Sequence, residues 1–152
     1  MYRKDVDGLR AIAVLPILLF HAGFEEFAGG FVGVDIFFVI SGYLISSIIY
    51  RELQNNQFSF LRFYERRIRR ILPAFLTVTM VVLLVGYFVL LDEEYARLAK
   101  SSISALFFLP NVFFWHTTDY FSIDAATSPL LHTWSLGIEE QFYFVFPCIL
   151  LL

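Results

Sequence analysis

Apolar segments of membrane-spanning length constrain the fold of this 152-residue chain more than any other feature. A helix needs about 20 predominantly apolar residues to cross a bilayer, where its backbone must satisfy its own hydrogen bonds. Four such segments and the start of a fifth cover residues 9–24, 31–50, 71–91, 95–115 and 142–152. The fourth contains Pro110 and is predicted to be either a tilted span or a re-entrant piece. The fifth is too short to cross a membrane alone, so we expect it to be incomplete.

Composition supports the same conclusion. Hydrophobic residues make up 59% of the chain and charged residues only 16%, whereas soluble domains are about half apolar and a quarter charged. The sequence has no glycine-rich phosphate loop and no Cys/His cluster with metal-ligand spacing, and nothing in it points to nucleic acid. We therefore expect an all-α, polytopic transmembrane helix bundle surrounded by membrane lipid. Residues 1–152 would form the N-terminal part of a larger membrane domain, with about four spans and the start of a fifth.

Basic residues predict how the chain is oriented. Arginine and lysine are enriched in cytoplasmic loops. They occur at the N-terminus and again between the second and third segments, where residues 51–70 hold six arginines. The loop at residues 22–30 contains Glu25 and Glu26 and no basic residue. We expect the N-terminus and the arginine-rich loop on the cytoplasmic side of the membrane, and the acidic loop outside. Residues 116–140 contain no lysine or arginine, so the rule does not place them.

Two ionisable residues occupy the first apolar segment. His21 follows Arg10 by eleven residues, which at about 100° per residue is roughly 20° beyond three full turns. The two side chains therefore share one helix face and stand about 16 Å apart along the axis. Ionisable residues at membrane depth are costly and usually serve function. The structural alternatives are a snorkelling Arg10 paired with Asp7, and a His21 hydrogen-bonded at a helix end.

The basic segment at residues 60–70 has two interpretations. It is predicted to be an amphipathic helix, which can lie on anionic lipid. Arginine side chains also bind phosphate in a bidentate manner, so the segment can instead hold a phosphate-bearing ligand. Arg67 and Arg70 are three residues apart and share a helix face, but Arg66 and Arg69 have the same spacing.

Further polar residues lie beside the apolar segments. Asp35 begins the second segment, where it either caps a helix or takes part in chemistry. Glu139 and Glu140 precede the fifth segment, as a charge pair at a helix start or as buried carboxylates. His116 and His132 stay unassigned, with a pairing of His132 and Glu139 as an alternative.

Four stretches in this order carry a family resemblance. They are YRKDVDGLRAIAVLPILLFH, GGFVGVDIFFVISGYLI, FYERRIRRILPA and PLLHTWSLGIEEQFYFVFP. Together they resemble membrane acyltransferase family 3, the bacterial sugar O-acyltransferases, over residues 2–147. The chain is most similar to the lipopolysaccharide or peptidoglycan O-acetylases. These often carry an extracytoplasmic SGNH-type domain after the membrane part, which would follow the present segment.

The resemblance also implies roles for individual residues. The family has three sequence elements that match this chain. Its Arg-(ten residues)-His element falls on Arg10 and His21, and its Arg-x-x-Arg element falls on Arg67 and Arg70. Its Trp-Ser-Leu…Glu…Gln-Phe-Tyr element falls on residues 134–143. It implies Arg10, His21 and Glu139 as catalytic residues, with Glu139 rather than Glu140 as the family's fixed acid. It implies acetyl-CoA as the donor, with its phosphates bound by Arg67 and Arg70, and no metal.

An enzyme is therefore the expected function. It would move an acyl group, most simply acetyl, from acyl-CoA to a hydroxyl of a cell-envelope polysaccharide or glycan. It would belong to the acyltransferases that transfer groups other than amino-acyl groups. The alternative is a transporter or carrier of a small sugar-like or anionic substrate, because intramembrane charges mark substrate pathways there too. The polar face of the first segment together with the basic helix favours the enzyme, and the chain lacks the repeated halves typical of transporters.

Overall fold

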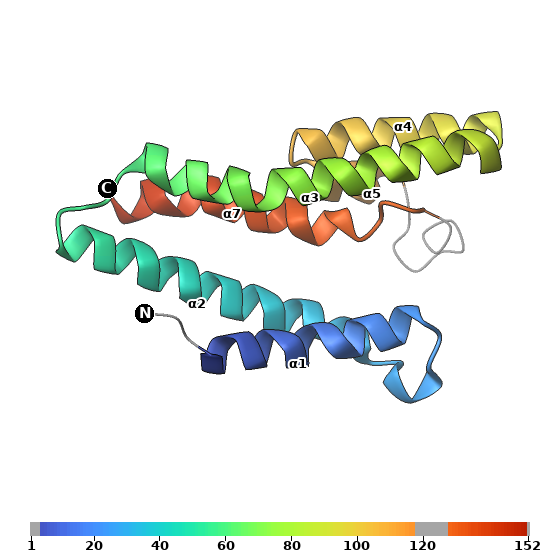
Figure 1. The fold of residues 1–152 in the computed structure, drawn as a ribbon. Helices are drawn as coiled ribbons and strands as arrows, with labels where there is room; N and C mark the ends of the chain where they lie inside the picture. Colours follow the sequence, from blue (N-terminus) through green and yellow to red (C-terminus); the bar gives the residue numbers. More distant parts are fainter. Residues whose placement is uncertain (1–3, 118–127, 152) are drawn as a thin grey trace. The chain divides into compact units, whose positions relative to one another are not determined.

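The described part of the chain is helical throughout. The computed structural model describes residues 4–117 and 128–151, and within these ranges it contains helices and turns but no strand. The chain divides into two compact units, Met1–Gln57 and Phe58–Leu152. The first holds α1 (Lys4–His21), the 3-10 turns η1 (Glu25–Phe27) and η2 (Gly30–Val32), and α2 (Gly33–Gln54). The second holds α3 (Phe60–Val89), α4 (Asp92–Leu106), α5 (Pro110–Thr117) and α7 (Thr133–Leu150), as Figure 1 shows.

The first unit is a hairpin of α1 and α2 whose helices approach closely. A Cβ atom on Gly30 would overlap the backbone carbonyl of Pro16, and one on Gly33 would overlap that of Ala13. Small residues let membrane helices pack at such short separation. Gly23, with φ of 83°, ends α1 in a backbone conformation that glycine adopts without strain.

The basic segment and the third apolar segment form one continuous helix. We expected an amphipathic helix at residues 60–70 and a separate span from residue 71, but α3 runs through Pro73 for 30 residues. Proline has no backbone N–H, so a proline inside a helix removes one of the helix's hydrogen bonds. Here the hydroxyl of Thr77 donates to the Pro73 carbonyl at 2.8 Å, which adds a local bond next to the disturbed turn.

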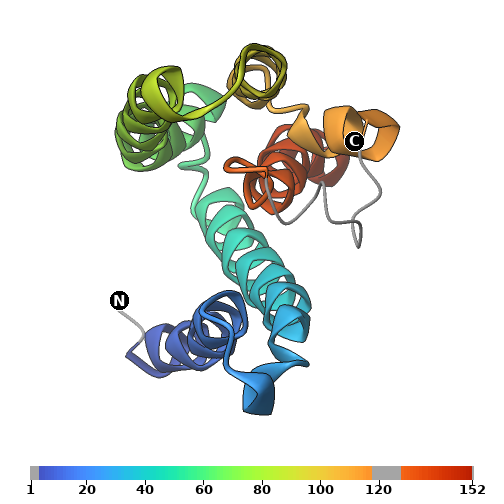
Figure 2. The same cartoon turned by 90° about the vertical axis from the view of Figure 1, so that its right-hand side faces the viewer.

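The fourth apolar segment is broken. One continuous helix over residues 95–115 is not formed: the chain forms α4 and α5, separated at Phe107–Leu109, where Phe108 has a positive φ of 58°. The alternative, a re-entrant piece, stays a prediction. A non-glycine residue in this conformation interrupts a helix. Figure 2 shows α4 between α3 on one side and the α5–α7 pair on the other.

Two helices within the described ranges are long and apolar enough to cross a membrane. They are Gly30–Gln54, which includes η2, and Phe60–Val89. The expected larger number of spans stays a prediction. The final helix α7 begins at Thr133, nine residues before the predicted start of the fifth segment, so the polar residues 133–141 belong to the same helix as the apolar ones.

Candidate functional site

His21 is the last residue of α1 and is exposed. Its Nδ1 lies 2.8 Å from the backbone carbonyl oxygen of Ile17, one turn earlier. A carbonyl only accepts hydrogen bonds, so Nδ1 must carry the proton in this arrangement. The neutral ring then has its lone pair on Nε2, which is the atom that can take a proton from a reacting group. The contact expected of a structural histidine is therefore present, and it leaves Nε2 of the neutral ring as the proton acceptor.

Arg10 packs against α2. Its guanidinium carbon lies 5.0 Å from the centroid of the Phe37 ring, and the side chain is half-buried. Cation–π contacts of this kind hold an arginine in one orientation. The structure gives no ion pair between Arg10 and Asp7, so that expected pairing is not formed in this part of the chain. Asp35 is exposed in the first turn of α2.

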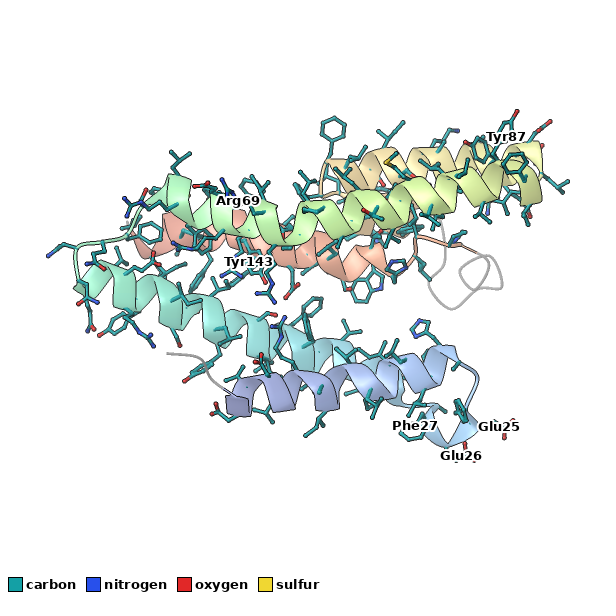
Figure 3. All side chains as sticks on the ribbon, in the orientation of Figure 1. Glu25, Glu26, Phe27, Arg69, Tyr87 and Tyr143 are labelled. Atoms are coloured by element: carbon teal, nitrogen blue, oxygen red, sulfur yellow. The ribbon has the colours of Figure 1, made fainter. Side chains whose placement is uncertain are left out.

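One arginine of the basic segment differs from its neighbours. Arg62, Arg66, Arg69 and Arg70 are exposed, and Arg69 pairs with Glu65 at 2.8 Å. Arg67 is half-buried, with its guanidinium carbon 5.5 Å from the ring of Phe63 and 5.5 Å from the ring of Tyr143 on α7. Figure 3 labels Arg69 on α3 and Tyr143 on α7. Arg67 is half-buried while Arg70 is exposed, so the two members of the Arg67–Arg70 pair have different surroundings, and their binding role stays a prediction.

The two adjacent glutamates of α7 have different surroundings. Glu139 is partly buried and accepts a hydrogen bond from the Tyr143 hydroxyl at 3.1 Å. Glu140 is only 6% exposed, and its Oε1 has no hydrogen-bond partner among the residues that the structure describes. The same holds for Nε of Arg67. The family resemblance implies Glu139 as the fixed acid, which stays a prediction, and the structure shows that Glu140 is the more deeply buried carboxylate.

A pair of side-chain amides joins α7 to the break between α4 and α5. The Gln141 amide nitrogen donates to the Phe108 carbonyl at 2.7 Å and to the Asn111 side-chain oxygen at 2.8 Å. A Cβ on Gly137 would lie 2.7 Å from Pro110 Cδ, so glycine is needed for this contact. Sequence reasoning assigned Gln141 to a motif but gave it no role. A glutamine directly before an apolar run was the available signal, because a buried amide requires partners.

Comparison with known proteins identifies the family. A family model described as an acyltransferase domain matches residues 3–152. The chain belongs to this acyltransferase family. No solved structure gives a significant match.

The curated relatives of this acyltransferase domain include named O-acetyltransferases. The chain is 42% identical over 99% of its length to the peptidoglycan O-acetyltransferase OatA of Listeria monocytogenes. It is 45% identical over 98% to the putative peptidoglycan O-acetyltransferase YrhL of Bacillus subtilis, and 41% identical over 98% to the O-acetyltransferase OatA of Staphylococcus aureus. The chain spans about a quarter of the length of these relatives.

The acyltransferase domain thus brings together only part of the predicted site. Arg67 lies against the ring of Tyr143, whose hydroxyl donates to Glu139, where α3 and α7 contact each other. Arg10 and His21 lie on α1 in the other unit. Within the described ranges there is no cluster of three residues that could ligate a metal ion.

Proposed function

We propose that the protein containing this chain transfers an acetyl group from acetyl-CoA to a hydroxyl of a cell-envelope glycan, with peptidoglycan as the acceptor. The match to the acyltransferase family over residues 3–152 carries this proposal, and the names of the relatives supply its acceptor. We further propose that it lies in the bacterial plasma membrane with its N-terminus in the cytoplasm, as the distribution of arginines indicates.

In this proposal His21 acts as the general base. Its Nε2 takes the proton of the acceptor hydroxyl as the oxygen attacks the acyl carbonyl carbon. The new C–O bond replaces the thioester C–S bond, and the departing thiolate takes the proton that His21 accepted, which gives the thiol and restores the neutral ring. The bond from Nδ1 to the Ile17 carbonyl holds the neutral ring in the tautomer with a free Nε2, and it persists when Nε2 is protonated.

Arg10 would contact a different part of the donor. At about 1.5 Å per residue it stands roughly 16 Å from His21 along α1, too far to act at the same carbonyl. An extended thioester donor spans such a distance. Arg67 and Arg70 would contact the donor on the cytoplasmic side, and Glu139 would hold Tyr143 beside Arg67.

The test uses the purified full-length protein with acetyl-CoA and a soluble peptidoglycan oligosaccharide, with acetyl ester formation as the readout. We expect the His21→Ala variant to lose about 100-fold or more in turnover, the usual contribution of a general base. The His116→Ala variant is the matched control, because His116 is also an exposed helical histidine. Uptake of sugar without ester formation, unchanged in His21→Ala, would instead identify a transporter.

A further inference from the structure

A polar cavity lies in the second unit where α3 ends and α4 begins. Its volume is about 120 Å³, and its lining includes Glu94, Arg97 and Ser101 of α4 and Phe114 of α5. Glu94 and Arg97 are three residues apart, so they share one face of α4. Glu94 Oε2 accepts a hydrogen bond from the Leu91 N–H at 3.0 Å, and among the described residues the two charges form no ion pair with each other. The cavity therefore presents one cation and one anion to a ligand.

An apolar groove continues from this cavity along α3. Its volume is about 310 Å³, every described residue that lines it is apolar, and it shares Leu90 and Pro129 with the cavity. Val81, Val85 and Val89 line it at intervals of four residues, and each is at least 54% exposed. This stripe extends about 12 Å along the helix axis, close to half of the roughly 30 Å hydrocarbon core of a bilayer. The groove thus has the length of the lipid chains in one leaflet.

Aromatic side chains indicate that this end of α3 lies at the membrane surface. Tyr87, which Figure 3 labels near the end of α3, lies 5.9 Å from Tyr95 of α4 between ring centroids. Trp115, which follows Phe114 in α5, is 79% exposed. Tryptophan and tyrosine are enriched at the level of the lipid headgroups, and α3 is long and apolar enough to span the bilayer up to Val89. Lipid headgroups are therefore expected beside the cavity, whichever side of the membrane it faces.

The two charges indicate which headgroup fits. A phosphate alone is attracted by Arg97 and repelled by Glu94, and for a cation alone the effects are reversed. A phosphate joined to a primary ammonium group gives each charge a partner, because a guanidinium binds phosphate and an ammonium donates to a carboxylate. The Ser101 hydroxyl donates to the Leu98 carbonyl at 2.8 Å, and its lone pairs can still accept from the ammonium.

We propose that the cavity and the groove together bind one phospholipid with an ethanolamine headgroup. Its phosphate lies at Arg97, its ammonium group at Glu94, and one of its hydrocarbon chains in the valine-lined groove of α3. Because residues of α3, α4 and α5 line the two spaces, the lipid joins these three helices at the membrane surface. The inference goes beyond the proposed function and does not depend on the acyl donor or acceptor, so either proposal can fail while the other stands.

The experiment measures dissociation constants of phosphatidylethanolamine, phosphatidylcholine and phosphatidylglycerol with identical chains, by native mass spectrometry of the full-length protein in detergent. We expect phosphatidylethanolamine to bind about 10-fold tighter than the other two, because the choline group has no N–H donor and the glycerol group has no positive charge. Glu94→Gln should remove this preference. Arg97→Ala should weaken all three lipids by about 10-fold or more, since each carries the phosphate. Glu93→Gln and Lys100→Ala change exposed charges of α4 outside the cavity and are the matched controls.

A second pair of variants tests the groove. Val85→Trp fills it and should weaken all three lipids, whereas Leu84→Trp changes an exposed position of α3 outside the groove and should not. Thermal unfolding of each variant without added lipid separates a loss of binding from a loss of fold. The inference is overturned if wild-type protein binds the three headgroups equally or prefers phosphatidylglycerol, if Glu94→Gln keeps the preference for ethanolamine, or if Val85→Trp and Leu84→Trp bind lipid alike.

Discussion

At the scale of single residues, Tyr143 connects the two parts of the α3–α7 contact. Its ring stacks beside the guanidinium of Arg67 and its hydroxyl donates to Glu139. The same side chain therefore contributes an apolar surface to one charge and a hydrogen bond to another. Tyr64 reinforces the contact, since its ring stacks on Phe144 at 5.2 Å and its hydroxyl donates to the Phe144 carbonyl.

Tyr143→Phe separates these two contributions. The ring beside Arg67 is retained, but Glu139 loses a hydrogen bond, so we expect the free energy of unfolding to fall by about 1 to 2 kcal/mol. Denaturant titration of the full-length protein in detergent measures the change. Tyr87→Phe is the control, because Tyr87 is exposed near the end of α3, as Figure 3 shows, and contacts Phe88 and Tyr95 through its ring. An equal loss in both variants would argue against the role of the Tyr143 hydroxyl.

At the scale of elements, glycines decide how closely α1 and α2 pack. Gly30 and Gly33 face backbone carbonyls of α1 with no space for a side chain, whereas a Cβ on Gly42 in α2 meets nothing within 4 Å. All three glycines lie in the continuous stretch from η2 into α2, so the space beside each one depends on whether its position faces α1. The hairpin that carries Arg10 and His21 therefore depends on two particular glycines.

Gly33→Ala should push α1 and α2 apart. We expect a loss of about 3 kcal/mol in the free energy of unfolding, as for other overpacked sites, and lower turnover because Arg10 loses its place over Phe37. Gly42→Ala is the matched control and should be neutral or stabilising by about 0.5 to 1 kcal/mol, since alanine favours a helix over glycine. Thermal unfolding and acetyl ester formation are measured for both variants. Similar behaviour of the two variants would contradict the close-packing argument.

The side-chain amides of Asn111 on α5 and Gln141 on α7 also connect two helices. Gln141→Leu removes the donor to the Phe108 carbonyl and to Asn111, and leaves both groups without this partner. We expect it to destabilise the protein by about 2 kcal/mol or more. Gln141→Leu combined with Asn111→Leu should cost less than the sum of the single variants, because the groups form one network. Strict additivity in this double-mutant cycle would show that the amides act independently.

At the scale of the whole molecule, apolar side chains cover much of the surface. Leu61 and Trp115 are each 79% exposed and Phe88 is 77% exposed, which a soluble protein avoids in contiguous patches. Lipid is as apolar as these side chains, so their exposure has no cost in a bilayer. The surface, like the two candidate spans, is that of a membrane protein.

The proposed orientation predicts which loops are accessible from outside the cell. In a background in which Cys148 and every other native cysteine of the full-length protein are replaced by serine, we expect Glu25→Cys to react with a membrane-impermeant maleimide in cells whose plasma membrane is intact. Asn56→Cys, in the loop between α2 and α3, should react only after the membrane is permeabilised. Both positions are exposed, so accessibility to the reagent differs only through the side of the membrane. The opposite labelling pattern would reverse the orientation.

The sequence by itself determined the helical membrane character, the common helix of Arg10 and His21, and the basic helix that contains Arg67. These properties follow from hydropathy and from the period of a single helix, which neighbouring residues define. Only the tertiary structure decided that Arg67 lies inward, that Glu140 is buried while Glu139 accepts from Tyr143, and that the fourth segment breaks at Phe108. The physical reason is that these features depend on partners from other helices, such as Tyr143 for Arg67 and Gln141 for Phe108. Local periodicity does not report which of two adjacent residues meets a helix more than thirty residues away.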